Sequence, residues 1–121
     1  MRRTALRPSA GTRWPQTVRE HVATHQPPCI GELTDPPMPG ICWPPSELDH
    51  VRASGGIGMK SDSIATNAAR LCHAHHELKT HEARTWRPRL LAVIADLHGE
   101  CAECQRESIE RYGMPLEGVA S

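Results

Sequence analysis

The chain has 121 residues and a formal net charge of zero, and 38% of its residues are hydrophobic, with no Phe and one Tyr. This length predicts one domain, and so few aromatic residues predict a small core that needs a disulfide or a metal to stabilise it. The net charge of zero differs from the positive net charge of a typical nucleic-acid binder. No apolar run approaches the ~18 residues that span a bilayer. No apolar segment follows the charged N-terminal residues, as a secretory signal requires, so a cytoplasmic location is expected.

Residues 1–11 are expected to form a disordered basic tail, which either is solvated or follows a phosphate backbone. Residues 12–25 predict a helix. Thr12 can cap this helix, and Trp14, Val18 and Val22 recur on one face. The next twenty residues contain seven Pro, which excludes a long helix or strand.

Residues 46–51 predict a short strand, and a turn-rich segment follows it. A helix is expected from about Ala68 to near Arg84. The apolar spacing of residues 87–99 is typical of a strong helix that stops at Gly99, and a last helix is expected to end at Gly113. The predicted domain is 12–113, with a core at 29–84, C-terminal helices at 88–113 and a tail at 114–121.

Metal-binding side chains are concentrated in the middle of the chain. Asp49 and His50 are neighbours, so on a strand their side chains point to opposite faces, and one can bind a metal while the other faces a substrate. On a helix, Cys72, His75 and His76 lie on neighbouring parts of the surface. Cys72-x-x-His75 is a usual half-site for structural zinc, which leaves His76 for a different metal.

The order of these residues along the chain resembles the motif of the HNH endonuclease family, of the ββα-metal or His-Me finger type. The residues that carry the resemblance are "LDHV", "SGG", Asn67 and "LCHAHHELKT", within residues 29–80. Asn67 precedes His76 by nine residues, which is the interval in that family. The resemblance implies an α+β fold, with a small zinc-stapled ββα core and flanking helices.

The resemblance also implies a role for each residue. Asp49 and His76 would ligate a catalytic divalent metal (Mg²⁺, Mn²⁺ or Ni²⁺), and His50 would be the general base. Asn67 would orient the His50 region through a hydrogen bond, although it could instead cap a following helix. Lys79 would contact the substrate phosphate, although an exposed lysine is usually only solvated. His21, His25 and His73 have no counterpart in the motif and are interpreted as surface residues.

The structural zinc site is where the chain departs from the family pattern. The odd number of Cys, five, favours a metal over a disulfide framework. The second half-site has His75 where the family usually has Cys, and the first half-site is stretched, because Cys42 is preceded thirteen residues earlier by Cys29. The favoured ligands are Cys29, Cys42, Cys72 and His75. The rival pair Cys101-x-x-Cys104 could complete this site, hold a separate metal or pack as small hydrophobic residues.

The function that these features favour is that of a metal-dependent HNH endonuclease, which hydrolyses DNA phosphodiester bonds and leaves 3′-hydroxyl and 5′-phosphate ends. Its small size resembles phage-encoded members that work beside the packaging machinery, which implies packaging proteins as partners and the host cytoplasm as location. The alternative is a non-catalytic zinc module that binds nucleic acid or a protein. A structural finger needs none of Asp49, His50, Asn67 and His76.

Overall fold

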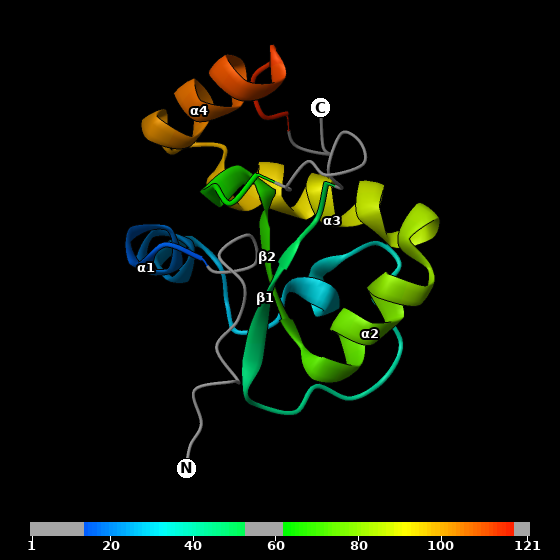
Figure 1. Cartoon of the computed structure of the whole chain (residues 1–121). Helices are drawn as coiled ribbons and strands as arrows, with labels where there is room; N and C mark the ends of the chain where they lie inside the picture. Colours follow the sequence, from blue (N-terminus) through cyan, green and yellow to red (C-terminus); the bar gives the residue numbers. More distant parts are fainter. Residues whose placement is uncertain (1–13, 53–61, 118–121) are drawn as a thin grey trace, which may run out of the picture.

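The computed structural model describes residues 14–52 and 62–117, and its fold is α+β (Figure 1). The elements in chain order are α1 (Gln16–His25), η3 (Ile30–Leu33), β1 (Ser46–His50), η4 (Ala65–Asn67), β2 (Ala68–Cys72), α2 (His73–His81), α3 (Ala83–His98) and α4 (Ala102–Tyr112). None of the described helices has the length and apolar character to cross a membrane. The predicted tail at 1–11 and the glycines of the "SGG" turn lie outside the described residues.

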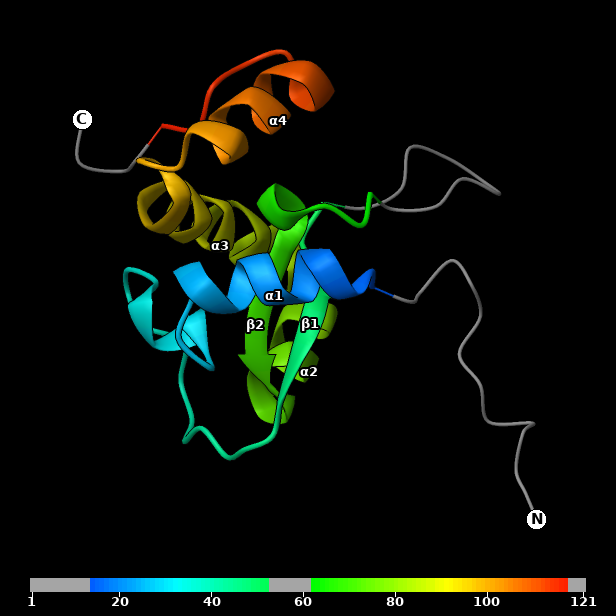
Figure 2. The ribbon, with the colours of Figure 1, turned by 90° about the vertical axis from the view of Figure 1, so that its left-hand side faces the viewer.

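A two-stranded antiparallel sheet lies at the centre. In its register Asp49 is opposite Ala69 and His50 is opposite Ala68. Successive strand residues face opposite sides of a sheet, so Asp49 is on one face of β1 and His50 is on the other. Figures 1 and 2 show that α2 covers one face and α1 the other, so the two neighbouring side chains enter different layers of the molecule.

The helix predicted from Ala68 is wrong over its first five residues, which form β2. The alanines favour a helix, but β2 is enclosed on both faces, and Ala68, Ala69 and Leu71 are fully buried. Burial on two faces suits a strand of small and apolar residues, and tertiary packing overrides local propensity. The α2 helix begins at His73, with Cys72 as its N-cap residue, so Asn67 does not cap it.

The predicted face of the first helix is confirmed: Trp14, Val18 and Val22 pack in one small cluster with Ala65 and Ala68. The helix itself starts later than expected, at Gln16 after Pro15. A larger hydrophobic cluster packs on the other side of the sheet, against α2 and α3. It includes Ile30, Leu71, Trp86, Leu90 and Ile94. These two clusters hold the sheet between α1 on one side and α2 and α3 on the other.

The helices α3 and α4 form where the sequence predicted them, except that α3 begins earlier than expected. The predicted break between residues 84 and 88 lies instead at Glu82, and α3 continues through Pro88 to a C-cap at Gly99. The α4 helix ends at Gly113, whose φ of 78° is left-handed as expected of a glycine in this position. After it, the Leu116 N–H donates to Gln105 Oε1 (2.9 Å).

Candidate functional site

Cys29, Cys42, Cys72 and His75 come together at the junction of β2 and α2. One candidate ligand atom from each of the four lies within 4.8 Å of those of the other three. The His75 Nδ1 atom is 3.2 Å from Cys29 Sγ and 3.5 Å from Cys42 Sγ. The group is the one favoured from the sequence, and it could hold a metal ion such as zinc.

The orientation of His75 suits a ligand. Its imidazole is fully buried, and Nε2 donates a hydrogen bond to the Pro39 carbonyl oxygen (2.9 Å). This bond places the ring hydrogen on Nε2 and directs the Nδ1 lone pair at the sulfurs, as for histidines that bind metals. Gly31 permits the close packing, because a Cβ there would lie 2.7 Å from His75 Nδ1 and 2.9 Å from Met38 Sδ.

The three thiols influence each other's ionisation. For Cys72, burial opposes ionisation, but N–H groups of His75 and Trp43 outweigh it and lower the pKa. For Cys42, burial and the adjacent Cys29 raise the pKa. Crowded thiolates are stabilised by a divalent cation, and three sulfurs with one imidazole nitrogen match a tetrahedral zinc site.

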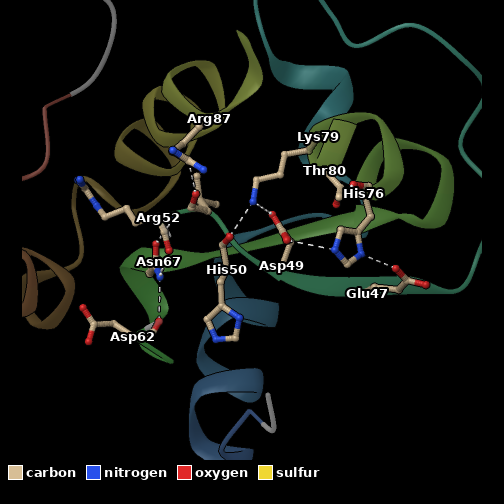
Figure 3. A network of polar contacts seen from close by, with 11 residues as sticks. Glu47, Asp49, His50, Arg52, Asp62, Asn67, His76, Lys79, Thr80 and Arg87 are labelled. Atoms are coloured by element: carbon tan, nitrogen blue, oxygen red, sulfur yellow. Dashed lines mark hydrogen bonds and ion pairs between the residues drawn. The ribbon is translucent and has the colours of Figure 1, made fainter. Parts of the chain in front are cut away.

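A second polar group lies on the α2 side of β1 (Figure 3). Asp49 Oδ1 is 3.1 Å from His76 Nε2, and Asp49 Oδ2 is 2.9 Å from Lys79 Nζ. Asp49 is buried, and among the described residues its Oδ2 has no hydrogen bond of good geometry despite the ion pair with Lys79. The pair Asp49 and His76, predicted as ligands of one metal, is therefore brought into direct contact.

Glu47 belongs to this group and was missed in the sequence. Its Oε1 is 2.6 Å from His76 Nδ1. The hydrogen bond from His76 to Asp49, against the effect of burial and with help from Glu47, raises the His76 pKa to about 9. A carboxylate behind a histidine fixes the ring and directs its other nitrogen at a ligand site. The available signal was the Glu-x-Asp spacing, which puts both acids on one face of a strand.

The His50 imidazole lies on the opposite side of β1. Figure 3 shows it pointing toward α1, away from Asp49 and His76. It stacks on Trp14, with 4.0 Å between ring centroids, and its Nε2 is 2.9 Å from Ser63 Oγ. Burial lowers the pKa of His50, which is therefore neutral at pH 7. Neither partner was identified in the sequence, because no spacing links them to the motif.

Asn67 is fully buried and holds the chain that follows His50. Its Oδ1 accepts a hydrogen bond from the Arg52 N–H (2.7 Å), and its main-chain oxygen accepts one from the Val51 N–H (3.0 Å). Its Nδ2 donates to the Asp62 carbonyl oxygen (2.9 Å). Asn67 therefore bonds to the two residues after His50 and not to the imidazole itself.

Lys79 is placed differently from the expectation of an exposed phosphate contact. The residue is 7% exposed, and its Nζ donates to the His50 carbonyl oxygen (2.8 Å) in addition to the ion pair with Asp49. Arg87 Nε donates to the next carbonyl oxygen, that of Val51 (2.8 Å). In this structure the two cations fix the turn after His50.

Cys101 and Cys104 do not join the cluster at Cys72. They lie at the start of α4, where the Cys104 N–H donates to Cys101 Sγ (3.3 Å) and His21 Nε2 is 3.1 Å from Cys104 Sγ. His21 is thus half-buried beside a thiol, which differs from its interpretation as a surface residue. The side chain of His73 is 68% exposed, which confirms that interpretation for His73.

The unit β1–β2–α2 supplies Asp49 from a strand, His76 from a helix and a zinc-type cluster at the strand–helix junction. The chain matches no protein-family model, and no curated protein or solved structure matches it significantly. The function of the chain is therefore inferred from the geometry of these side chains together with the resemblance in the sequence.

Proposed function

We propose that the protein is a metal-dependent endonuclease of the HNH type that hydrolyses phosphodiester bonds in DNA. The observation that carries the proposal is the contact between Asp49 Oδ1 and His76 Nε2, 3.1 Å apart on the strand and helix of a ββα unit. A carboxylate and an imidazole leave most positions of an octahedral Mg²⁺ or Mn²⁺ ion open to water and phosphate oxygens. When bound, such an ion stabilises the charge that develops on the leaving 3′ oxygen.

Asp49 and His76 are assigned as the ligands of this ion. Glu47 accepts the His76 Nδ1 hydrogen and so directs Nε2 toward the shared position with Asp49. Lys79 limits the cost of burying the Asp49 carboxylate, because an unpaired buried charge is strongly unfavourable. Lys79 is therefore assigned to positioning Asp49, in place of the phosphate contact that the sequence favoured.

His50 is assigned as the general base. Its neutral imidazole is in the protonation state that can accept a proton from water near pH 7. Because Asp49 and His50 are consecutive at the end of β1, a phosphate would have to lie across that end of the strand to meet both. Ser63 and Trp14 hold the ring, and Asn67 holds the backbone beside it.

The structural zinc is assigned to Cys29, Cys42, Cys72 and His75. This cluster sits where β2 passes into α2, directly before His76 in the chain. An ion there would fix the start of the helix that carries the catalytic ligand. DNA as substrate, and phage packaging proteins as partners, are proposed from the resemblance to HNH enzymes.

The test is cleavage of a supercoiled plasmid by the purified chain with Mg²⁺, Mn²⁺ or Ni²⁺, and with EDTA. The wild type is expected to nick or linearise the plasmid only when a metal is present. Asp49→Ala and His76→Ala are expected to lose cleavage. The matched control is His81→Ala, an exposed histidine at the end of α2, which is expected to cleave as the wild type does.

His50→Ala tests the base, and loss of a general base lowers the rate by ~10²–10⁴. Circular dichroism and zinc content should stay unchanged in this variant. Wild-type rates in folded His50→Ala contradict the assignment of the base. If the wild type binds DNA or a protein but cleaves with none of the metals, the alternative of a non-catalytic zinc module replaces the proposal.

A further inference from the structure

A second group of metal-binding side chains lies on the α1 side of the molecule, remote in sequence from the HNH-like motif. One candidate ligand atom from each of His21, His25, His98 and Cys104 lies within 4.8 Å of those of the other three. Two of these residues are on α1, one is the last residue of α3, and Cys104 is in the first turn of α4. His98 and Cys104 are almost completely buried.

Cys101 is a fifth donor beside this group, and its sulfur lies within 4.8 Å of candidate ligand atoms of His21 and Glu103. His21 Nε2 lies between the two sulfurs, 3.1 Å from Cys104 Sγ and 3.5 Å from Cys101 Sγ. His21 and His25 are one helical turn apart, and Cys101-x-x-Cys104 spans the N-cap and first turn of a helix. Pairs of the form His-x₃-His and Cys-x₂-Cys are the usual ligand pairs of a Cys₂His₂ zinc site.

Gln26 decides which of the five donors is not a ligand. Its Oε1 accepts from the Arg70 N–H (2.9 Å), and its Nε2 donates to the Ala68 carbonyl oxygen (2.8 Å), so two backbone groups fix the orientation of the amide. The same Nε2 is 3.0 Å from His98 Nε2, which must therefore accept. The Gln26 amide thus places the single hydrogen of a neutral His98 on Nδ1.

His98 Nδ1 faces Cys104 Sγ at 3.2 Å, so it donates a hydrogen bond to the sulfur. Because His98 Nε2 accepts from Gln26, it carries no hydrogen, so His98 is a neutral imidazole with its one ring hydrogen on Nδ1. The contrast with His75 is direct: there a carbonyl oxygen accepts the Nε2 hydrogen and leaves Nδ1 free to bind a metal.

We propose that His21, His25, Cys101 and Cys104 bind a second divalent metal ion of the zinc type, and that His98 donates a hydrogen bond to the Cys104 thiolate. Cys101 Sγ is 3.5 Å from His21 Nε2, and its side chain would turn toward His25 to complete a tetrahedron around the ion. A pocket of about 200 Å³ lined by His21, Cys104, Glu103 and Glu107 gives the ion a path from solvent with acidic residues along it.

The proposed ion would join parts of the chain that are far apart in sequence. Cys104 follows His21 by 83 residues, and the ion would tie α1 to the start of α4. With the cluster at Cys72, all five cysteines of the chain become ligands, three at one ion and two at the other. The odd number of cysteines, which no disulfide framework explains, then follows from a three-and-two division.

The test is the number of zinc ions per chain, counted by native mass spectrometry after dialysis against metal-free buffer. The wild type is expected to carry two. Cys101→Ser and His25→Gln should each carry one, and Cys29→Ser should also carry one because it affects only the other cluster. Combining Cys29→Ser with Cys101→Ser should leave none, and the exposed control His81→Gln should keep two.

The variant His98→Gln tests whether His98 is a metal ligand or only a hydrogen-bond donor. The glutamine amide can still donate to the Cys104 thiolate. This variant is expected to keep both ions, and its circular dichroism checks that it folds. With cobalt in place of zinc, its sulfur-to-metal charge-transfer band should shift while the ion stays bound. A single ion in the wild type that is lost with Cys29→Ser overturns the second site. Two ions in folded Cys101→Ser, or loss of one in folded His98→Gln, overturn the ligand set.

Discussion

His76 lies between two carboxylates, and its protonation sets how a metal can bind beside it. Its pKa of about 9 means that the imidazole is protonated at pH 7 and lies between Asp49 and Glu47 as a cation. A metal ion can use Nε2 only after that proton leaves. We therefore expect Mn²⁺ affinity to rise as pH rises toward 9, with about one proton released per ion at pH 7.5.

Calorimetry in two buffers of equal pH and different ionisation enthalpy measures the released proton. His76→Ala is the control and should release none. Equal binding heats in the two buffers for the wild type contradict this description of the site.

Gly31 shows how a single missing side chain shapes the candidate zinc site at Cys29, Cys42, Cys72 and His75. A Cβ there would lie 2.7 Å from His75 Nδ1, and the ring cannot move freely because Pro39 holds its other nitrogen. Gly31→Ala is therefore expected to weaken zinc binding and lower the melting temperature together. Competition with a chromogenic chelator measures the affinity.

Gly113→Ala is the matched control for this effect. No atom would meet its Cβ within 4 Å, but its φ of 78° disfavours alanine. It should cost ~1 kcal/mol of folding stability through the backbone while zinc affinity stays unchanged. If both variants bind zinc as the wild type does, the close approach at Gly31 does not control the cluster.

At the scale of elements, β2 occupies residues where the sequence predicted the start of a helix. Ala69 is fully buried in its middle, with a helical layer on each side of the sheet. Ala69→Leu is expected to destabilise the fold by ~1–3 kcal/mol, because a well-packed site has no room for three more carbons. Urea denaturation measures the loss, and Ala74→Leu on the exposed side of α2 is the control. A loss equal to that of Ala74→Leu would show that β2 tolerates larger side chains.

The elements that sequence predicted well are those with a local signal. The helices α3 and α4 follow from apolar spacing and a stop glycine, and β1 follows from a short segment between turn-rich stretches. That Cys29 and Cys42 meet Cys72 and His75 was predicted from the resemblance and a Pro-rich loop. By contrast, the pairing that makes β2 and the meeting of His21 with Cys104 depend on segments distant in sequence, which periodicity does not report.

At the scale of the whole molecule, the described core is small and consists of two clusters on either side of the sheet. Metal binding in such a domain contributes directly to folding. We expect removal of the zinc by a strong chelator to lower the melting temperature far more than removal of the weakly bound catalytic ion by dialysis does. Cys72→Ser should show the same loss without chelator. Differential scanning calorimetry measures both, and equal melting temperatures with and without zinc contradict a metal-stabilised fold.

The cysteines of the candidate zinc site differ in access to solvent: Cys72 is buried, whereas Cys29 and Cys42 are partly exposed. An oxidant therefore reaches Cys29 and Cys42 first, and a disulfide between them would remove two ligands at once. The fold is then coupled to the redox state of its surroundings. Mild peroxide should release zinc in step with loss of free thiols, and dithiothreitol with added zinc should restore it. Zinc retained after both thiols are oxidised would show that this coupling is absent.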